Sequence, residues 1–315
     1  MSSNLQMKIL AKETAIYGAS SIVGKFLNWL LVPLYTYVLQ QQSDYGIVTN
    51  LYAWTALLLV ILTYGMETGF FRFVNKAEEN PKTVYSTSLI ALFTTSLLFG
   101  LVCVVWQTPL AGLLGYPDHS EFVALLGVTV AIDAFASIPF AYLRYKKRPL
   151  QFAALKLLFV FLNIALNLFF LVLCPKMQDW AIISSWYNPN YGVGYVFVAN
   201  ILATAVQTVC LLPAIIEGFK GSKDIFSWGL LKQMLRYSLP LLVLGVCGIM
   251  NQTLDRILFP FFYDGADAQA QLGIYGACFK VAMVMMMFTQ AFRYAYEPFV
   301  FAKHKDRESV AAYAD

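Results

Sequence analysis

Several ionisable side chains stand inside long apolar runs of this sequence. Charge at the depth of a bilayer is costly, so it marks either a functional site or a paired structural group. Guanidinium and ammonium groups both bind phosphate oxygens. Because cations outnumber acids, the interior carries surplus positive charge, which favours a phosphate-bearing ligand. The cations are Lys25, Lys156, Arg256 and Lys280, and the acids are Asp133 and Asp255.

Neutral polar residues accompany most of these charges at helical spacing, so several predicted helices carry a polar stripe along one face. Lipid would leave such groups without hydrogen bonds, and they must therefore face one another or water. Several stripes together would enclose a hydrated cavity. The stripes are Ser21, Lys25 and Asn28; Thr129, Asp133 and Ser137; Lys156, Asn163 and Asn167; Asn200, Thr204 and Gln207; Asn251 and Asp255; and Gln252 and Arg256.

From these positions we predict a site that binds the phosphate or glycan part of a ligand. Asp133 is instead a candidate for binding an ion or a proton, or for pairing with a cation. The alternative is a structural network of interhelical hydrogen bonds and ion pairs, such as Lys25 or Lys156 with Asp133. The predicted binding residues are Lys25, Asn28, Lys156, Asn251, Asp255, Arg256 and Lys280.

The sequence offers few residues that could form a metal site, a disulfide framework or a cofactor site. The five cysteines lie in or at the ends of apolar runs without a Cys-x-x-Cys pair, which is typical of small hydrophobic residues. The two histidines, His119 and His304, both fall in loops. We therefore predict no metal site and no cofactor.

The composition excludes an ordinary soluble domain. Hydrophobic residues make up 59% of the chain, charged residues 13%, and the mean hydropathy is +0.62, whereas soluble domains are roughly half apolar and a quarter charged. The net charge of +4 comes from short basic clusters between apolar runs, a pattern that does not suit nucleic acid. The first apolar run is too long for a cleaved signal peptide. We predict an integral membrane protein.

Eight runs have the length of about 20 apolar residues that a helix needs to cross a bilayer. They are apolar on all sides, whereas barrel strands alternate, so the predicted fold is an all-α polytopic membrane bundle. Prolines inside three runs (Pro33, Pro139 and Pro240) are expected to kink their helices. The predicted spans are residues 14–39, 45–66, 83–106, 121–143, 151–174, 191–213, 237–262 and 272–296.

Lysine and arginine gather in every second loop. They occur at the N-terminus and after the second, fourth, sixth and eighth runs, whereas the intervening loops hold only Lys176. The positive-inside rule therefore places both termini in the cytoplasm. The outer loops are residues 40–44, 107–120, 175–190 and 264–271, and all are too short for a catalytic domain.

A shift of 230 residues (275 minus 45) aligns Tyr45-Gly46 with Tyr275-Gly276. It also aligns Tyr64, Glu67 and Phe71 with Tyr294, Glu297 and Phe301. Chance similarity is the alternative, but a repeat in one orientation would be a known transporter architecture. On that basis we predict a first six-helix lobe at 1–213, a cytoplasmic linker at 214–236, and the first two helices of a second lobe at 237–315.

Short motifs along the whole chain carry a family resemblance. They are the basic residue within Thr14–Leu39, Asp44-Tyr45-Gly46, Gly69-Phe70-Phe71-Arg72-Phe73, the basic turn Leu143–Arg148, Ser238-Leu239-Pro240, Asp255-Arg256, Gly273-Ile274-Tyr275 and Glu297-Pro298-Phe299. With these motifs the sequence resembles the polysaccharide-flippase branch of the MOP exporter superfamily. That superfamily includes O-antigen and lipid II flippases and, more distantly, MATE drug exporters.

The resemblance implies a V-shaped, two-lobed transporter, not an enzyme, that acts in polysaccharide or lipopolysaccharide biosynthesis. It would move an undecaprenyl-pyrophosphate-linked oligosaccharide across the bacterial inner membrane by alternating access, with Lys25, Arg256 and Lys280 near the phosphates. Expected partners are membrane lipids and glycan-biosynthesis enzymes but not nucleic acid, and a monomer is expected. Family members have twelve or fourteen spans, so a chain with eight is expected to be a fragment or to have an incomplete second lobe.

Two other functions stay open. A cation-coupled multidrug exporter of MATE type needs an acidic ion site in the first lobe, but the first run carries Lys25 and no acid, and Asp133 alone offers weak support. A membrane-embedded glycan transferase or polymerase would usually carry a large outer loop or an acidic metal motif, and the sequence shows neither. Drug efflux driven by a cation gradient would identify the exporter.

Overall fold

Helices form nearly all regular structure in the computed structural model, which describes residue 18 and residues 22–39, 41–76, 79–220, 225–263 and 265–303. No strand occurs within these ranges, and the predicted all-α bundle is confirmed. The elements are α2 (Leu31–Val38), α3 (Gln42–Thr63), α4 (Met66–Val74), α5 (Pro81–Val105), α6 (Gln107–Leu113), α7 (Ser120–Tyr145), α8 (Pro149–Leu168), the π-helical turn η1 (Phe169–Leu173), α9 (Cys174–Lys176), α10 (Ala181–Ser184), the 3-10 turn η2 (Pro189–Tyr191), α11 (Gly194–Cys210), α12 (Leu212–Phe219), α13 (Trp228–Phe262) and α14 (Ala268–Lys303).

Five of the helical stretches are long and apolar enough to cross a membrane. The pair α11 and α12, bent by 41°, makes a sixth if it counts as one span. Residues Ile22–Val38 form a shorter apolar helix. The predicted first span begins at residue 14, but of residues 14–21 only residue 18 belongs to the described part of the chain. Helix α14 covers the predicted eighth span. The five stretches are Gln42–Val74, Pro81–Val105, Ser120–Tyr145, Pro149–Lys176 and Trp228–Phe262.

Several helical stretches extend by more than three residues beyond a predicted end, and one of them is α14, which passes both ends of the predicted span 272–296. After Tyr64 and Gly65, both in the left-handed region (φ 36° and 68°), α4 continues the second run to Val74. The seventh run begins at Trp228, not near residue 237, because the Ser227 hydroxyl accepts a hydrogen bond from the Leu230 amide at 3.3 Å and caps the helix. Parts of the predicted linker, residues 214–219 and 228–236, are therefore helical.

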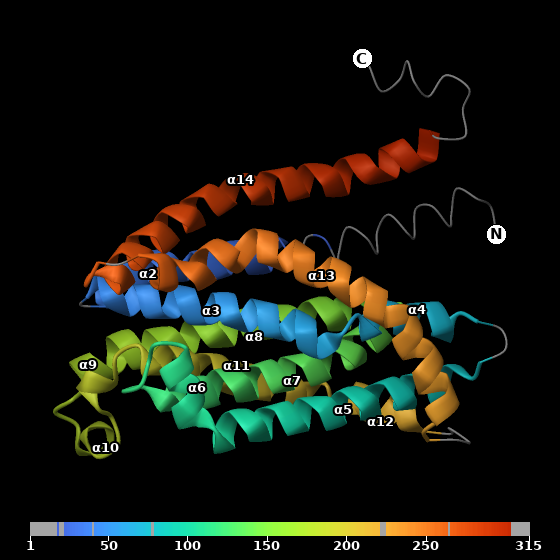
Figure 1. The fold of residues 1–315 in the computed structure, drawn as a ribbon, viewed down its shortest axis with the longest axis horizontal. Coiled ribbons are helices and arrows are strands. Elements are labelled where there is room, and N and C mark those ends of the chain that lie inside the picture. The colour runs from blue at the N-terminus through green and yellow to red at the C-terminus, as the bar shows by residue number, and fades with distance from the viewer. Residues whose placement is uncertain are drawn as a thin grey trace.

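The helices form two groups with α3 between them (Figure 1). Helices α5 and α7 pack along each other, and α11 packs on α7 and α8. On the other side, α3 packs against both α13 and α14. Helices α3 and α14 begin at the same end of the molecule, and α14 then leaves the bundle along its length (Figure 1). The helices on the α14 side are therefore close together at one end and apart at the other.

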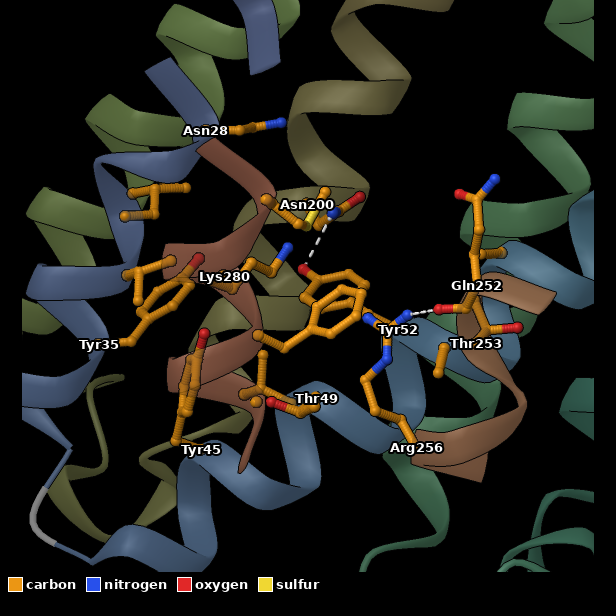
Figure 2. Close-up of a pocket in the computed structure, with 18 of the residues that line it drawn as sticks. Asn28, Tyr35, Tyr45, Thr49, Tyr52, Asn200, Gln252, Thr253, Arg256 and Lys280 are labelled. Carbon is orange, nitrogen blue, oxygen red and sulfur yellow. Dashed lines mark hydrogen bonds between the residues drawn. The ribbon is translucent and has the colours of Figure 1, made fainter. Parts of the chain in front are cut away.

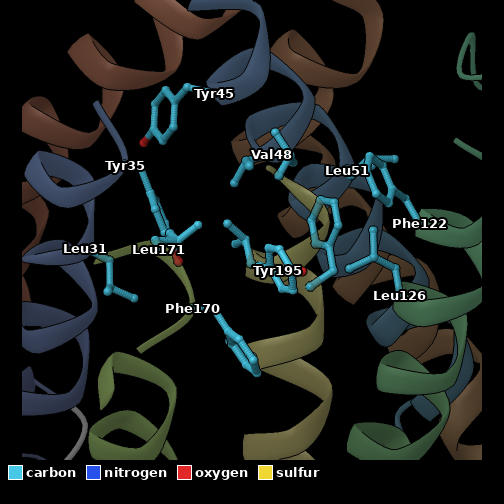
Figure 3. Packing of buried hydrophobic residues seen from close by; sticks show 14 of the residues in the cluster. Leu31, Tyr35, Tyr45, Val48, Leu51, Phe122, Leu126, Phe170, Leu171 and Tyr195 are labelled. Carbon is cyan, nitrogen blue, oxygen red and sulfur yellow. The ribbon is translucent and has the colours of Figure 1, made fainter. Parts of the chain in front are cut away.

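Two apolar cores hold the opposite ends of the α3–α4 stretch. The first lies around the start of α3, where Tyr45, Val48 and Leu51 pack with residues of α2, α7 and α11 (Figure 3). The second surrounds α4, where Met66 and Phe70 are fully buried against α5, α7 and α13. Because each core is built from several helices, the segment between them is held from both ends.

Candidate functional site

A cavity of about 410 Å³ lies between α2, α3, α8, α11, α13 and α14 (Figure 2). Its size falls within the range of small-molecule sites. The described residues of its lining include two cations and no acid. The polar and charged lining consists of Asn28, Tyr35, Tyr45, Thr49, Tyr52, Asn163, Asn200, Gln252, Thr253, Arg256 and Lys280.

Arg256 enters the cavity from α13 with only 9% of its surface exposed. One N–H of its guanidinium donates to the backbone carbonyl of Gln252, one turn earlier. The guanidinium carbon lies 4.2 Å from the ring centroid of Phe279, within the range of a cation–π contact. Its buried Nε has no hydrogen-bond partner within the described residues. The side chain is therefore fixed in direction yet keeps donors for a ligand.

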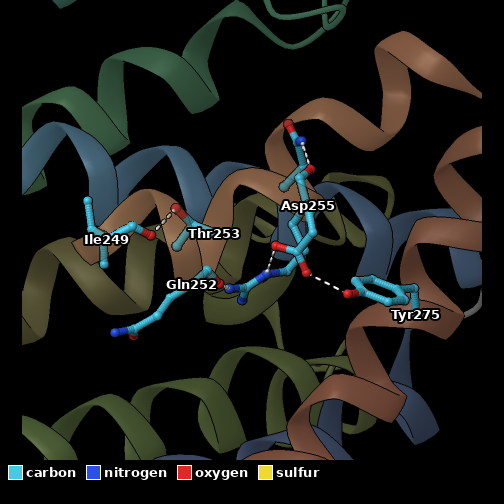
Figure 4. A network of polar contacts seen from close by, with 7 residues as sticks. Ile249, Gln252, Thr253, Asp255 and Tyr275 are labelled. Atoms are coloured by element: carbon cyan, nitrogen blue, oxygen red, sulfur yellow. Dashed lines mark hydrogen bonds and ion pairs between the residues drawn. The ribbon is translucent and has the colours of Figure 1, made fainter. Parts of the chain in front are cut away.

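Asp255 lies behind Arg256 and outside the cavity lining. Its Oδ1 is 3.5 Å from the Arg256 Nε, and its Oδ2 accepts a hydrogen bond of 2.5 Å from the Tyr275 hydroxyl (Figure 4). This carboxylate offsets part of the arginine charge from one side only. A role of Asp255 in contacting a ligand stays a prediction.

Lys280 is the second cation of the lining and comes from α14. Its backbone carbonyl accepts a hydrogen bond from Trp29 Nε1 at 3.0 Å, which ties α14 to the first helix. Within the described part of the chain, neither an ion pair nor a hydrogen bond engages its ammonium group. Arg256 and Lys280 are like charges that line the same cavity, so an anion placed between them would reduce their mutual repulsion.

The structure brings only some of the predicted site residues together. Asn28, Arg256 and Lys280 line the cavity, whereas Lys25 and Asn251 are exposed and lie outside its lining. Lys156 also lies outside: its ammonium is 4.0 Å from the Phe140 ring centroid. No ion pair joins Lys156 to Asp133 among the described residues, so the alternative of such a pair stays a prediction. A role of Lys25, Lys156 and Asn251 in binding stays a prediction.

The sequence analysis missed the tyrosines of the lining. Tyr45, Thr49 and Tyr52 recur at spacings of four and three residues on α3, so they form a stripe comparable to the ones that were identified. Hydropathy groups phenol side chains with the apolar residues, which hides this stripe in the sequence. Side chains of the predicted repeat partners Tyr294, Glu297 and Phe301 lie outside the described residues, as does Ser21.

One end of the cavity is closed where α3 and α14 touch. A Cβ added to Gly46 would lie 1.9 Å from the Gln269 carbonyl oxygen, and one added to Gly273 would lie 2.2 Å from that of Gln42. The two backbones therefore meet directly, as small residues allow in membrane helices. Asn50 adds a hydrogen bond of 2.7 Å from its amide to the Arg256 carbonyl.

Comparisons with known proteins fit this geometry. Residues 10–296 match the family described as polysaccharide biosynthesis protein. The chain belongs to this family. The resemblance to polysaccharide flippases that the motifs predicted is thereby confirmed. A search of curated proteins finds no match to this sequence.

Two solved structures share the fold. One is a chain described as protein A (TM-score 0.68), and the other is the MATE multidrug transporter DinF-BH, solved as a complex (TM-score 0.67). Each is 16% identical in sequence and matches 93% of this chain, which spans 64% of the length of each neighbour. The chain of this polysaccharide biosynthesis family member is therefore a multi-pass, MATE-like helical bundle.

Proposed function

We propose that this protein moves a lipid-linked oligosaccharide, joined to undecaprenol through a pyrophosphate, across the bacterial inner membrane. The single observation that carries the proposal is the cavity lining with Arg256 and Lys280 and no acid among its described residues. The buried Arg256 and the half-buried Lys280 face one cavity, which favours an anionic occupant. A pyrophosphate supplies that anion, and its oxygens suit both the guanidinium and the ammonium.

The attraction is large enough to matter for transport. Two unit charges 4 Å apart interact by about 4 kcal/mol at the effective dielectric constant of a protein surface, compared with about 1 kcal/mol in water. Two such contacts would offset much of the cost of taking a pyrophosphate out of water. The lipid chain, which needs no such compensation, would stay in the bilayer beside the cavity.

The arrangement of α3 and α14 suggests how the cavity alternates between the two sides. The closed end lies at the start of both helices, which the distribution of basic loops assigns to the outer face. The diverging end of α14 (Figure 1) would then admit the head group from the cytoplasm. Rocking of the α13–α14 side against the rest would separate the helices at Gly46 and release the glycan outside.

The same proposal covers the cellular setting. Both termini would lie in the cytoplasm, and a single copy would carry out transport within a polysaccharide pathway such as that of O-antigen or lipopolysaccharide. Glycan-biosynthesis enzymes would deliver the lipid-linked substrate, and membrane lipids would surround the bundle. In this proposal the chain consists of a first lobe (1–213), a linker (214–236) and the start of a second lobe (237–315).

A cation-coupled multidrug exporter is the second candidate, because the MATE fold also serves that function in a structural neighbour. Its lining argues against this use: an organic cation would meet Arg256 and Lys280 with no acid of the described lining to pair with. Asp133, the acid that an ion site would need, lies outside the described lining of the cavity.

Replacement of Lys280 tests the proposal in cells that depend on this protein for glycan export. Lys280→Met should abolish export at unchanged protein level, because it removes an ammonium that has no structural partner within the described residues. Lys280→Arg should keep most of it, because the proposed role is electrostatic. Full export by Lys280→Met, or drug efflux that depends on a cation gradient, would contradict the proposal.

A further inference from the structure

The two sides of the cavity differ in chemistry. Both cations come from α13 and α14, whereas the opposite side, formed by α2, α3, α8 and α11, presents only neutral polar and apolar groups. We call Tyr35, Tyr52, Asn163 and Asn200 the neutral wall. A ligand that fills the whole cavity must therefore combine an anionic part with a part that carries neutral hydrogen-bonding groups.

Hydrogen bonds fix the amides of the neutral wall from behind. The Asn200 amide donates to the Tyr52 hydroxyl at 3.0 Å (Figure 2). The Tyr35 hydroxyl donates to Asn167 at 3.0 Å, and the Asn167 amide donates to the Asn163 side-chain and backbone oxygens at 3.2 and 2.8 Å. Both amides are thus held in one orientation before any ligand arrives, as a selective site requires.

These bonds leave unused hydrogen-bonding capacity in the cavity. Asn163 is only 4% exposed, and within the described residues no hydrogen bond uses its amide N–H groups. Likewise, the carbonyl oxygen of Asn200 accepts none there. Each wall amide therefore keeps part of its capacity for a ligand, Asn163 as a donor and Asn200 as an acceptor. An occupant that forms hydrogen bonds with both amides is therefore favoured over one that cannot.

We propose that the neutral wall binds the sugar ring next to the phosphate, and that Asn163 and Asn200 select which sugar enters. This rests on the proposed function, which places the pyrophosphate at Arg256 and Lys280. A sugar hydroxyl both donates and accepts, so neighbouring hydroxyls match a donor and an acceptor. The rings of Tyr35 and Tyr52 supply apolar surface for the C–H face of the sugar. An acyl chain, by contrast, would leave both amides unsatisfied.

Binding to three defined ligands tests this assignment. The full chain in lipid nanodiscs is titrated with undecaprenyl pyrophosphate, with the same lipid carrying one hexose, and with the same lipid carrying one N-acetylhexosamine. The informative quantity is the affinity for a sugar-bearing lipid divided by that for the bare lipid, because this ratio does not depend on the fraction of folded protein.

Asn163→Leu and Asn200→Leu should each lower this ratio about tenfold for the preferred sugar, the usual effect of one lost hydrogen bond, and should leave binding of the bare lipid unchanged. Asn190→Leu removes an exposed amide of the η2 turn that lies outside the lining; it is the matched control and should change neither. Lys280→Met should lower the affinity for all three ligands and leave the affinity ratio unchanged.

Three results would count against these assignments. If the asparagine variants lose affinity equally for the bare and the sugar-bearing lipid, the assignment of the sugar site is wrong, whereas the assignment of the phosphate site is unaffected. A parent protein that prefers neither sugar over the bare lipid would also overturn it. Unchanged binding of the bare lipid in Lys280→Met would refute the proposed function itself.

Discussion

The close contact between α3 and α14 allows a specific prediction for the effect of Gly46→Ala on helix separation. The new Cβ would lie 1.9 Å from the Gln269 carbonyl oxygen, although real Cβ contacts essentially never fall under 3.0 Å. The helices must therefore separate by about 1.1 Å (3.0 minus 1.9) at this point. Because the obstacle is backbone and not a flexible side chain, no rotamer change can avoid the separation.

The cost of such overpacking is about 1–3 kcal/mol. It falls only on the state in which this end is closed, since the helices would be apart when the end is open. A difference of that size shifts a two-state equilibrium by about 5- to 150-fold. Gly46→Ala should therefore populate the state that is open at the end predicted to face outward.

Labelling from outside the cell measures this population. A Gln252→Cys reporter in the cavity lining is placed in a background whose exposed Cys210, Cys247 and Cys278 are replaced by serine. A membrane-impermeant maleimide should label this reporter several-fold faster in Gly46→Ala than in the parent. The buried Cys103 and Cys174 stay in place and should remain unlabelled, which excludes unfolding as the cause.

Gly248→Ala is the matched control, because a Cβ on this glycine of α13 would meet nothing within 4 Å. It should label at the parent rate. If Gly46→Ala labels no faster than Gly248→Ala, then either this end does not open or it does not face outward, and the proposed direction of access is wrong.

Two further predictions concern stability. Lys147 follows the C-cap of α7, Lys146, and lies in the left-handed region (φ 54°). The Arg148 amide donates to the Leu143 carbonyl at 3.0 Å, an arrangement that favours glycine at residue 147. Lys147→Gly should therefore raise the free energy of unfolding by about 1 kcal/mol, seen as a higher thermal midpoint, and an unchanged midpoint would contradict it. Glu67 pairs with Arg144 across α4 and α7; a double-mutant cycle with Glu67→Gln and Arg144→Gln should give a coupling of about 0.2–1 kcal/mol because both side chains are partly exposed, and zero coupling would show that the pair contributes nothing.

Hydropathy predicted the helices well because the cost of exposing peptide groups to lipid leaves little choice of structure. The ends of the helices were less predictable. Helix α13 starts at Trp228 because of the Ser227 cap and because Leu230 and Met234 pack on α4 and α5. Both reasons lie in the region predicted as a cytoplasmic linker, where hydropathy carries little information.

The site was predicted only in part because a span that is apolar on every side does not reveal which face meets its neighbours. Asn28 and Lys25 lie on one predicted stripe, yet only Asn28 reaches the lining. Lys156 and Asn163 likewise share a stripe, and only Asn163 lines the cavity. A side chain enters a cavity according to helix rotation and tilt, which depend on packing partners far away in the sequence.

Arg256 belongs to the cavity lining and to the closed end at once. Its guanidinium faces the cavity, while its backbone carbonyl accepts the Asn50 amide from α3 at 2.7 Å. Asn50 in turn accepts a hydrogen bond from Tyr116 at 3.1 Å, which connects the contact to the α6–α7 loop. A ligand can shift an equilibrium only by binding two states differently. Under the proposed function, the pyrophosphate meets this condition because Arg256 both binds it and connects α13 to α3. A lipid without phosphate would not bind Arg256 and would not affect the closed end.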